Sequence, residues 1–446
     1  MRRSKAPLDL ELGLEYYASE TEGIGGRLRQ EPEDFVVIEI SEDGTTAYPP
    51  LRDSTGQGNY VWFVVKKRKV DSITALKIIA KAVGVSHKRF TVAGLKDARA
   101  VAYQFACTED VDVKILSGVR TEHVQVLSVF RRPFRLVPGM LFGNAFTVTV
   151  RGIEVRPPEA EERVKRILGE LKIAGGAPNY YGYQRFGTIR PNTHKIGRYL
   201  LKGMFKEAFE EAVLKAYPNE SPWAKEARIF LAQTGDFEAA LKKFPPNLHH
   251  ERVMLRWLAR RPGDYIGAFR ALPLSIRRLF IGAYQSYLFN KVLSRRIKCG
   301  LRIDYAYPGD YVAIYSRDGY RIRLRGTLKV TDTNREKLNE LIKRGLASLV
   351  INVFGYRTRL AGGVQGEIER SVLREEGVSL ADFQVKSMPE AASKGDVRRC
   401  ALNPMNFTYS IGNSSARFSF TLLKGSYATV LLREFMKPRD IVAAGL

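Results

Sequence analysis

Short apolar runs bounded by turn residues predict strands along the first third of the chain. Residues 34–40 (DFVVIEI) alternate between apolar and polar side chains, which is typical of a half-buried strand. Residues 60–66 (YVWFVVK) are almost continuously apolar and predict a second strand. The same reasoning predicts further strands at 90–95, 101–108, 124–130 and 144–151.

Two helices are predicted between these strands. The segment SITALKIIAKAV has helical periodicity, with Asp71 or Ser72 available as its cap and Gly84 at its end. A second helix runs from Pro158 to Lys172, with proline in the first turn and two glycines after the last.

The middle of the chain has a helical pattern, and its end returns to strands. Residues 193–300 are mainly helical, and a mixed stretch follows with strands at 311–330 and 349–353 and helices near 333–345 and after LAGGVQG. The segments RRCALNPMNFTYSI and SARFSFTLLKG predict strands, and SYATVLLREFM predicts an amphipathic final helix. We therefore expect an α+β fold in which the terminal strands complete one sheet and the helical middle is an insertion.

Composition places the chain among globular proteins. Its 446 residues are 45% hydrophobic, enough for two to four domains with their own cores. No apolar run is long enough to span a bilayer, and the start lacks a signal-peptide core, so we expect a cytoplasmic protein without a membrane partner. The three cysteines are scattered and the five histidines form no ligand pair, so we expect no metal.

The positive charge is concentrated in four windows. The formal net charge is +25, and residues 60–100, 130–151, 180–206 and 252–302 hold 32 Lys and Arg against 3 Asp and Glu. The same windows are rich in aromatic side chains, which stack on unpaired bases, while the basic groups attract a polyanion. A nucleic-acid partner is the favoured interpretation, and a generally basic surface without a partner is the alternative.

Two loops contain residues suited to chemistry. Asp97 lies in KDARA between two apolar runs, beside Lys96, so it could act as a carboxylate nucleophile or base, or simply cap a turn. The segment PNYYGYQRFG (178–187) combines four aromatics with two glycines and amide groups, which suits recognition of an extruded base. A packed surface loop is the alternative there.

Two further segments are less specific. In GAYQSYLFN (282–290), Tyr284 and Leu288 share one helical face, so packing is the favoured interpretation. Arg29 precedes the first predicted strand and could pair with a carboxylate, although any surface arginine would give the same pattern.

Taken together, these segments resemble the TruD family of tRNA pseudouridine synthases, and the length resembles its archaeal branch. EPEDFVVIEI, AGLKDARAVAYQ, GNAFTVTV, PNYYGYQRFG, AYQSYLFN and SYATVLLREFM occur here in the family's order and span nearly the whole chain. The resemblance implies a catalytic domain with a curved mixed sheet and an inserted, mainly helical TRUD domain. It divides the chain into residues 1–190 (catalytic), 191–388 (inserted) and 389–446 (catalytic).

The resemblance also implies roles for particular residues. Asp97 corresponds to the catalytic aspartate, and Tyr181 takes the position of an aromatic that stacks on the target base. Asn179 matches an asparagine near the active site, and Arg29 stands where the family places a basic partner of the aspartate. Lys96, next to Asp97 in the same motif, is expected to bind substrate.

The implied reaction is the conversion of uridine, commonly uridine-13 of tRNA, to pseudouridine by a monomer without metal or cofactor. The aspartate would either attack C1′ or remove the 2′-proton. A non-catalytic tRNA-binding protein or RNA chaperone on the same scaffold is the main alternative. A metal-dependent nuclease ranks last, because the basic windows hold only Asp71, Asp97 and Asp264 as carboxylates.

Overall fold

The chain forms two compact units, each assembled from segments distant in sequence. The structure is a computed structural model that describes residues 1–48 and 58–446. The sheet unit contains residues 18–177, 314–326 and 402–446, and the helix-rich unit contains residues 1–17, 178–313 and 327–401. The domain boundaries expected at 190/191 and 388/389 stay a prediction about the family's domains.

A nine-stranded sheet is the framework of the sheet unit. Its main path runs β14-β15-β7-β2-β5-β3-β6, with β1 paired to β7 and β4 to β5. Among the described residues of this sheet, only the β2–β5 pair is parallel, so the sheet is mixed, and the predicted α+β class is confirmed. The strands are β1 (Gly25–Arg27), β2 (Phe35–Ile40), β3 (Tyr60–Lys67), β4 (Thr91–Val92), β5 (Val101–Thr108), β6 (Val124–Arg132), β7 (Gly143–Ile153), β14 (Met405–Ile411) and β15 (Ser415–Leu423).

Strand β3 confirms the strand predicted at 60–66, and the structure shows that it is covered on both faces. Val61, Phe63 and Val65 pack in one core cluster with α2 (Ser72–Ala82), and Trp62 and Val64 pack in another on the opposite face. Asp71 caps α2 by accepting hydrogen bonds from the backbone amides of Ile73 and Thr74. The other helices of this unit are α3 (Val113–Ser117), α4 (Pro157–Ala174) and α14 (Ala428–Met436).

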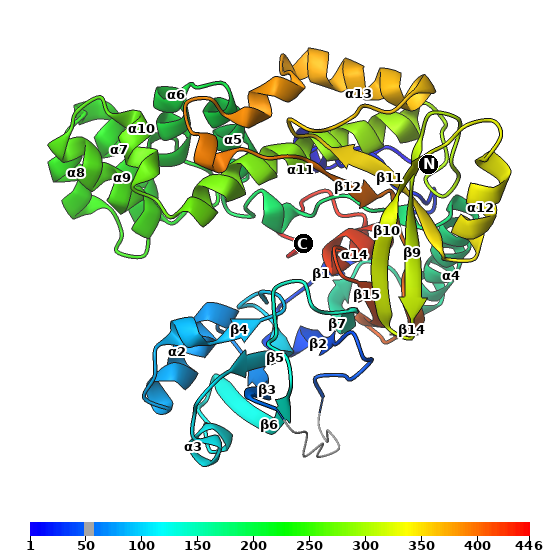
Figure 1. The fold of residues 1–446 in the computed structure, drawn as a ribbon, viewed down its shortest axis with the longest axis horizontal. Coiled ribbons are helices and arrows are strands. Elements are labelled where there is room, and N and C mark those ends of the chain that lie inside the picture. Colours follow the sequence, from blue (N-terminus) through cyan, green and yellow to red (C-terminus); the bar gives the residue numbers. More distant parts are fainter. Residues whose placement is uncertain (49–57) are drawn as a thin grey trace. The chain divides into compact units, whose positions relative to one another are not determined.

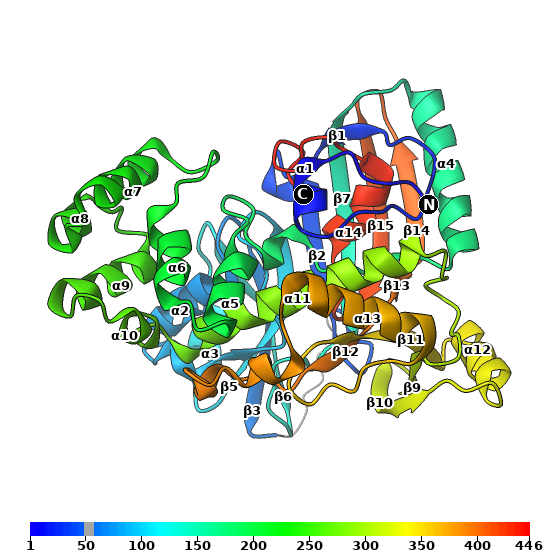
Figure 2. The same ribbon diagram turned by 90° about the horizontal axis from the view of Figure 1, so that it is seen from above.

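The predicted final helix is confirmed as α14, but it is buried on every side, so the prediction of the exposed polar face expected of an amphipathic helix is wrong. All nine of its residues are buried. Its Phe435 ring lies 5.3 Å from Phe407 of β14 and 5.1 Å from Phe418 of β15. Strand β1 and helix α4 also contact it, and Glu434 accepts hydrogen bonds from the amides of Ala18 and Ser19. The ribbon shows α14 among strands of the sheet unit (Figure 2), and its polar side chains are inside that unit.

The helix-rich unit is organised around α11 (Leu274–Lys298). Helices α5 (Thr193–Leu201) and α13 (Gly363–Glu376) lie along it (Figure 1). Tyr284 and Leu288 of α11 are fully buried, which confirms the packing interpretation of GAYQSYLFN. The other helices are α1 (Pro7–Glu11), α6 (Phe205–Phe209), α7 (Pro222–Thr234), α8 (Phe237–Lys243), α9 (His249–Arg260), α10 (Tyr265–Arg270) and α12 (Arg335–Lys343).

A smaller sheet belongs mostly to the helix-rich unit. Its strand order is β10-β9-β11-β12, which leaves β10 at one edge. The strands are β9 (Tyr311–Asp318), β10 (Arg321–Lys329), β11 (Ala347–Val353) and β12 (Asp396–Arg399). The far part of the β9–β10 hairpin, residues 314–326, groups with the sheet unit. Two short strands, β8 (Ala177–Pro178) and β13 (Ala401–Leu402), pair with each other.

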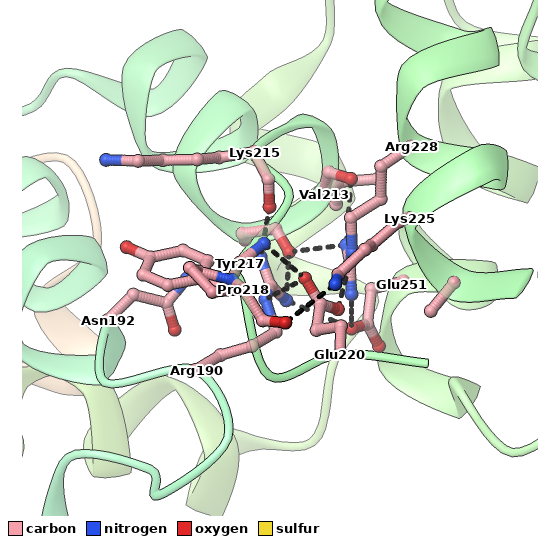
Figure 3. A network of polar contacts seen from close by, with 12 residues as sticks. Arg190, Asn192, Val213, Lys215, Tyr217, Pro218, Glu220, Lys225, Arg228 and Glu251 are labelled. Carbon is pink, nitrogen blue, oxygen red and sulfur yellow. Dashed lines mark hydrogen bonds and ion pairs between the residues drawn. The ribbon is translucent and has the colours of Figure 1, made fainter. Parts of the chain in front are cut away.

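A buried network of charges joins α7 to the elements around it (Figure 3). Arg228 is fully buried and bonds Glu220 at 2.8 Å and Glu251 at 3.0 Å. Arg190 pairs with the same two carboxylates. Both arginines also donate to backbone carbonyls of the π-helical turn 210–214.

Candidate active site

Asp97 lies in the loop between β4 and β5, as the strand–loop–strand pattern predicts. The two strands pair antiparallel, so the loop is held at the end of the sheet. The Asp97 carboxylate accepts a hydrogen bond from the backbone amide of Arg99 at 3.0 Å, and its side chain is one-third exposed. The carboxylate is therefore fixed by its own loop yet accessible to solvent.

Arg29 forms an ion pair with this carboxylate in the sheet unit. Its Nη2 lies 3.5 Å from Oδ2 of Asp97, and its guanidinium stacks 4.5 Å from the ring centroid of Phe35. Burial lowers the pKa of Arg29, while the charge of Asp97 raises it. A guanidinium stays protonated under such shifts, so the pair is a cation beside a carboxylate.

Lys96, the third residue expected here, points into the sheet. Its Nζ lies 2.6 Å from Oε1 of the fully buried Glu39 and donates to Oδ1 of Asn144 at 2.9 Å. The Lys96 amide also bonds the hydroxyl of Ser72 at 2.8 Å. These contacts hold the Asp97 loop against the sheet, and a direct contact of Lys96 with substrate stays a prediction.

Sequence reasoning did not identify Lys67, whose side chain holds the backbone of Asp97 in place. Its ammonium donates to the backbone carbonyl of Asp97 at 2.5 Å and to that of Val70 at 2.9 Å. Burial lowers the pKa of Lys67 to about 8, and the charges of Asp97 and Asp71 oppose that shift. Its position at the end of an apolar strand could have indicated that Lys67 is buried. The run KKRK, however, makes it look like surface charge.

The aromatic loop PNYYGYQRFG belongs to the helix-rich unit. Tyr180, Tyr183 and Phe186 are fully buried, so most of its rings belong to the core, as the packed-loop alternative expected. The hydroxyl of Tyr183 donates to Asp9 at 2.6 Å. Tyr181 is only partly buried, and this loop therefore presents one ring rather than four.

Two residues outside the loop fix Tyr181. The side chain of Asn290, the last residue of GAYQSYLFN, accepts from the Tyr181 amide at 2.8 Å and donates to its carbonyl at 3.1 Å. The Arg398 guanidinium, from β12, lies 4.0 Å from the centroid of the Tyr181 ring. Neither residue was predicted, because long-range contacts with a loop leave no local pattern in the sequence.

Asn179 is an internal anchor of the same loop. Its side-chain oxygen accepts from Arg398 at 3.0 Å, and its amide donates to the carbonyl of Arg399 at 3.1 Å. Arg398 also donates to the Asn179 carbonyl at 2.9 Å. Asn179 thus shapes the backbone that carries Tyr181, and its contact with substrate stays a prediction.

The predicted site residues therefore form two clusters. Arg29, Lys96 and Asp97 lie together in the sheet unit, and Asn179 and Tyr181 lie together in the helix-rich unit. In the described residues, no three or more His, Cys, Asp or Glu side chains gather in a way that could hold a metal ion. Over the same residues, no helix is long and apolar enough to cross a membrane.

Comparisons with known proteins agree on one family. The family model of tRNA pseudouridine synthase D (TruD) matches residues 11–435. The chain belongs to the TruD family. A Methanosarcina mazei protein named "Probable tRNA pseudouridine synthase D" is 37% identical over 436 residues, covering 96% of this chain and 97% of that protein. A Thermococcus sibiricus protein of the same name is 40% identical over 429 residues, covering 94% and 97%.

A solved TruD structure supports the fold. The crystal structure of the tRNA pseudouridine synthase D from Methanosarcina mazei has a TM-score of 0.80 and 36% identity, and the match covers 98% of this chain and 99% of that one. The resemblance to TruD proteins of the archaeal branch is confirmed. TruD enzymes are pseudouridine synthases, which are isomerases. Residues 436–446 follow the part of the chain that the TruD model matches.

Proposed function

We propose that this chain converts a uridine of tRNA, at position 13, to pseudouridine, with Asp97 as the catalytic carboxylate. The observation that carries the proposal is the exposed Asp97 carboxylate 3.5 Å from the buried Arg29 guanidinium, in a chain of the TruD family. An ionised, accessible carboxylate with a fixed cationic partner is suited to nucleophilic or base chemistry.

The reaction breaks the C1′–N1 glycosidic bond, turns the uracil and joins C5 to C1′. The proton on C5 leaves for solvent and N1 gains a proton, so substrate and product are isomers. Asp97 either attacks C1′ or accepts the 2′-proton, and its loop serves both routes because the Arg99 amide and Arg29 orient the carboxylate. No redox step or cofactor is needed for this balance of atoms.

The aromatic loop has the complementary role of holding the base. The Tyr181 ring stacks on the flipped uracil and keeps it in place between bond breaking and bond formation. Asn290 and Arg398 fix the Tyr181 backbone and ring, and Asn179 shapes the loop. Arg29 and Lys96 complete the set of residues proposed to act on substrate.

The proposed setting follows from the same chemistry. The substrate is tRNA, whose phosphates the basic surface attracts. We propose a cytoplasmic monomer that acts without metal or cofactor. Flipping a uridine out of its stack costs a few kcal/mol, which phosphate contacts offset.

The deciding experiment uses tRNA transcripts that contain 5-tritiated uridine. The wild-type chain should release tritium, and mapping should find pseudouridine at position 13. Asp97→Asn should abolish release while tRNA binding stays within about twofold, because the amide cannot act as nucleophile or base. Asp112→Asn is the matched control, since that carboxylate caps α3 and asparagine caps equally well.

Two outcomes would contradict the proposal. Tritium release by Asp97→Asn at the wild-type rate would exclude its catalytic role. Binding of tRNA without conversion by the wild type would instead favour the RNA chaperone or non-catalytic binding function.

A further inference from the structure

The last residues of the sequence fold back onto β1 next to Arg29. Asp440 begins a tight turn by accepting hydrogen bonds from the amides of Val442 and Ala443 at 3.0 and 2.9 Å. Ile441 and Leu446 are buried, so the turn is anchored at both ends. We call residues 440–446 the tail turn.

The tail turn bonds the two residues that follow β1. The carbonyl of Ala444 accepts from the Leu28 amide at 2.8 Å. The carbonyl of Gly445 accepts from Nη1 of Arg29 at 2.9 Å. The other end of the same guanidinium, Nη2, faces Asp97 at 3.5 Å. One planar cation thus directs one terminal nitrogen to the tail turn and the other to the candidate catalytic carboxylate.

The conformation of Arg29 requires such support. Its φ is 56°, in the left-handed region that side-chain-bearing residues rarely adopt. Its Nε is buried and has no hydrogen-bond partner in the described part of the chain, so Nη1 and Nη2 carry the polar contacts. Removing the Gly445 carbonyl would leave the guanidinium free to rotate about the stacked ring of Phe35.

A carbonyl is well suited to this role. It accepts a hydrogen bond from the guanidinium without neutralising its charge, so the cation remains available to Asp97. A second carboxylate at the same position would divide the charge of Arg29 between two anions.

We propose that the tail turn is a positioning element of the active site, with Gly445 orienting Arg29 toward Asp97. The proposal rests on the function proposed above for Asp97. It also lies outside the segment that the family model matches, because that match ends at residue 435.

Gly445→Ala is the direct test. Gly445 has a φ of +75°, and a Cβ there would lie 2.6 Å from the carbonyl oxygen of Leu28, so the tail turn must move away from β1. The matched control is Gly84→Ala, which has a similar φ of +71° but nothing within 4 Å of the added Cβ. We expect Gly445→Ala to lower kcat about tenfold with the KM for tRNA unchanged, and Gly84→Ala to leave both values unchanged.

A double-mutant cycle separates positioning from general loss of structure. Lysine at position 29 has a single ammonium and cannot bond the Gly445 carbonyl and Asp97 in the same forked geometry. Arg29→Lys should therefore lower kcat, and adding Gly445→Ala should lower it no further. Multiplication of the two effects would contradict the proposal, because the tail turn would then act through another route.

Asp440 provides a second, milder variant at an exposed position. Asp440→Ala removes the acceptor that begins the turn and should lower kcat, whereas Asp440→Asn keeps the acceptor and should restore it. Full activity of both Gly445→Ala and Asp440→Ala would overturn the inference.

The two proposals fail in different ways. An active Asp97→Asn variant overturns the proposed function itself. If Asp97→Asn is inactive while Gly445→Ala and Asp440→Ala both keep the kcat of Gly84→Ala, only the role of the tail turn is wrong.

Discussion

In each of the two site clusters, backbone carbonyls hold cationic side chains. Lys67 donates to the carbonyl of Asp97, Arg29 to that of Gly445 and Arg398 to that of Asn179. A carbonyl fixes a cation in place but leaves its net charge intact. These three side chains therefore have a fixed position and are not neutralised by the groups that hold them.

Burial of His194 makes the stability of the helix-rich unit depend on pH. The ring stacks on Tyr287 at 4.9 Å and meets Phe186 edge-on at 5.4 Å. Burial, with a smaller contribution from Lys195, lowers the pKa of His194 to about 3. Below pH 6.5 the unfolded chain binds a proton here that the folded chain does not, so folding weakens as the pH falls.

We expect His194→Phe to remove part of this dependence. The wild type should lose up to ~1.4 kcal/mol of unfolding free energy per pH unit through this residue between pH 6.5 and about 3. Urea unfolding of the wild type and of His194→Phe at pH 7, 6 and 5 measures the difference in how their unfolding free energies depend on pH. His250→Phe, at an exposed position, is the control, and an equal pH dependence in all three proteins would contradict the assignment.

Individual site residues differ in how far the sequence could identify them. The resemblance to TruD singles out Asp97 and Arg29, and the structure brings their side chains together. Lys67, Asn290 and Arg398 act on residues 30 to more than 200 positions away. Such contacts are set by the fold and have no spacing that a sequence could reveal.

At the scale of elements, periodicity located helices and strands well and burial poorly. Residues 60–66 predict a strand because nearly every position is apolar, and β3 confirms it. Helix α14 carries Arg433 and Glu434, and these polar side chains suggested a solvent-exposed face. The amides of Ala18 and Ser19 satisfy Glu434 inside the unit, so polarity there reflects an internal bond.

The network around Arg228 should decide the stability of the helical elements α7 and α9. Arg228→Met leaves Glu220 and Glu251 buried without one of their cations, and we expect a loss of about 3–5 kcal/mol of unfolding free energy. The control is Arg302→Met, which breaks an exposed pair with Asp304 and should cost at most ~1 kcal/mol.

Tryptophan fluorescence offers a local measurement for this comparison. Trp223 and Trp257 lie on α7 and α9, so urea unfolding followed by their emission reports on these elements. Equal losses in Arg228→Met and Arg302→Met would show that the buried network contributes no more than a surface pair.

At the scale of the whole molecule, the basic side chains of the four windows are not all exposed to solvent. Lys67 and Arg296 are fully buried, and Arg296 pairs with Asp310 at 2.8 Å. Outside the windows, β10 carries Arg323 and Arg325, which are exposed and form no ion pair in the described residues. The four basic windows predicted a nucleic-acid partner. They did not identify exposed arginines such as Arg323 and Arg325, which lie outside the windows.

We expect the β10 arginines to contribute to tRNA binding. Residues two apart on a strand share a face, so Arg323 and Arg325 can contact neighbouring phosphates. Replacing both with glutamine should reduce the slope of log K against log salt concentration by about 1.5. Replacing Arg295 and Arg302, which are already paired with Glu375 and Asp304, is the control and should leave the slope unchanged.

The position of β15 in the large sheet has a consequence for biosynthesis. It pairs with β7 along nine residues, and about 260 residues separate the two strands in the sequence. During translation, the β15 side of β7 therefore stays uncovered while the whole helix-rich middle emerges from the ribosome. At roughly 5–20 residues per second this interval lasts about 13 to 50 s. A nascent chain of this protein must protect an open sheet edge for that time.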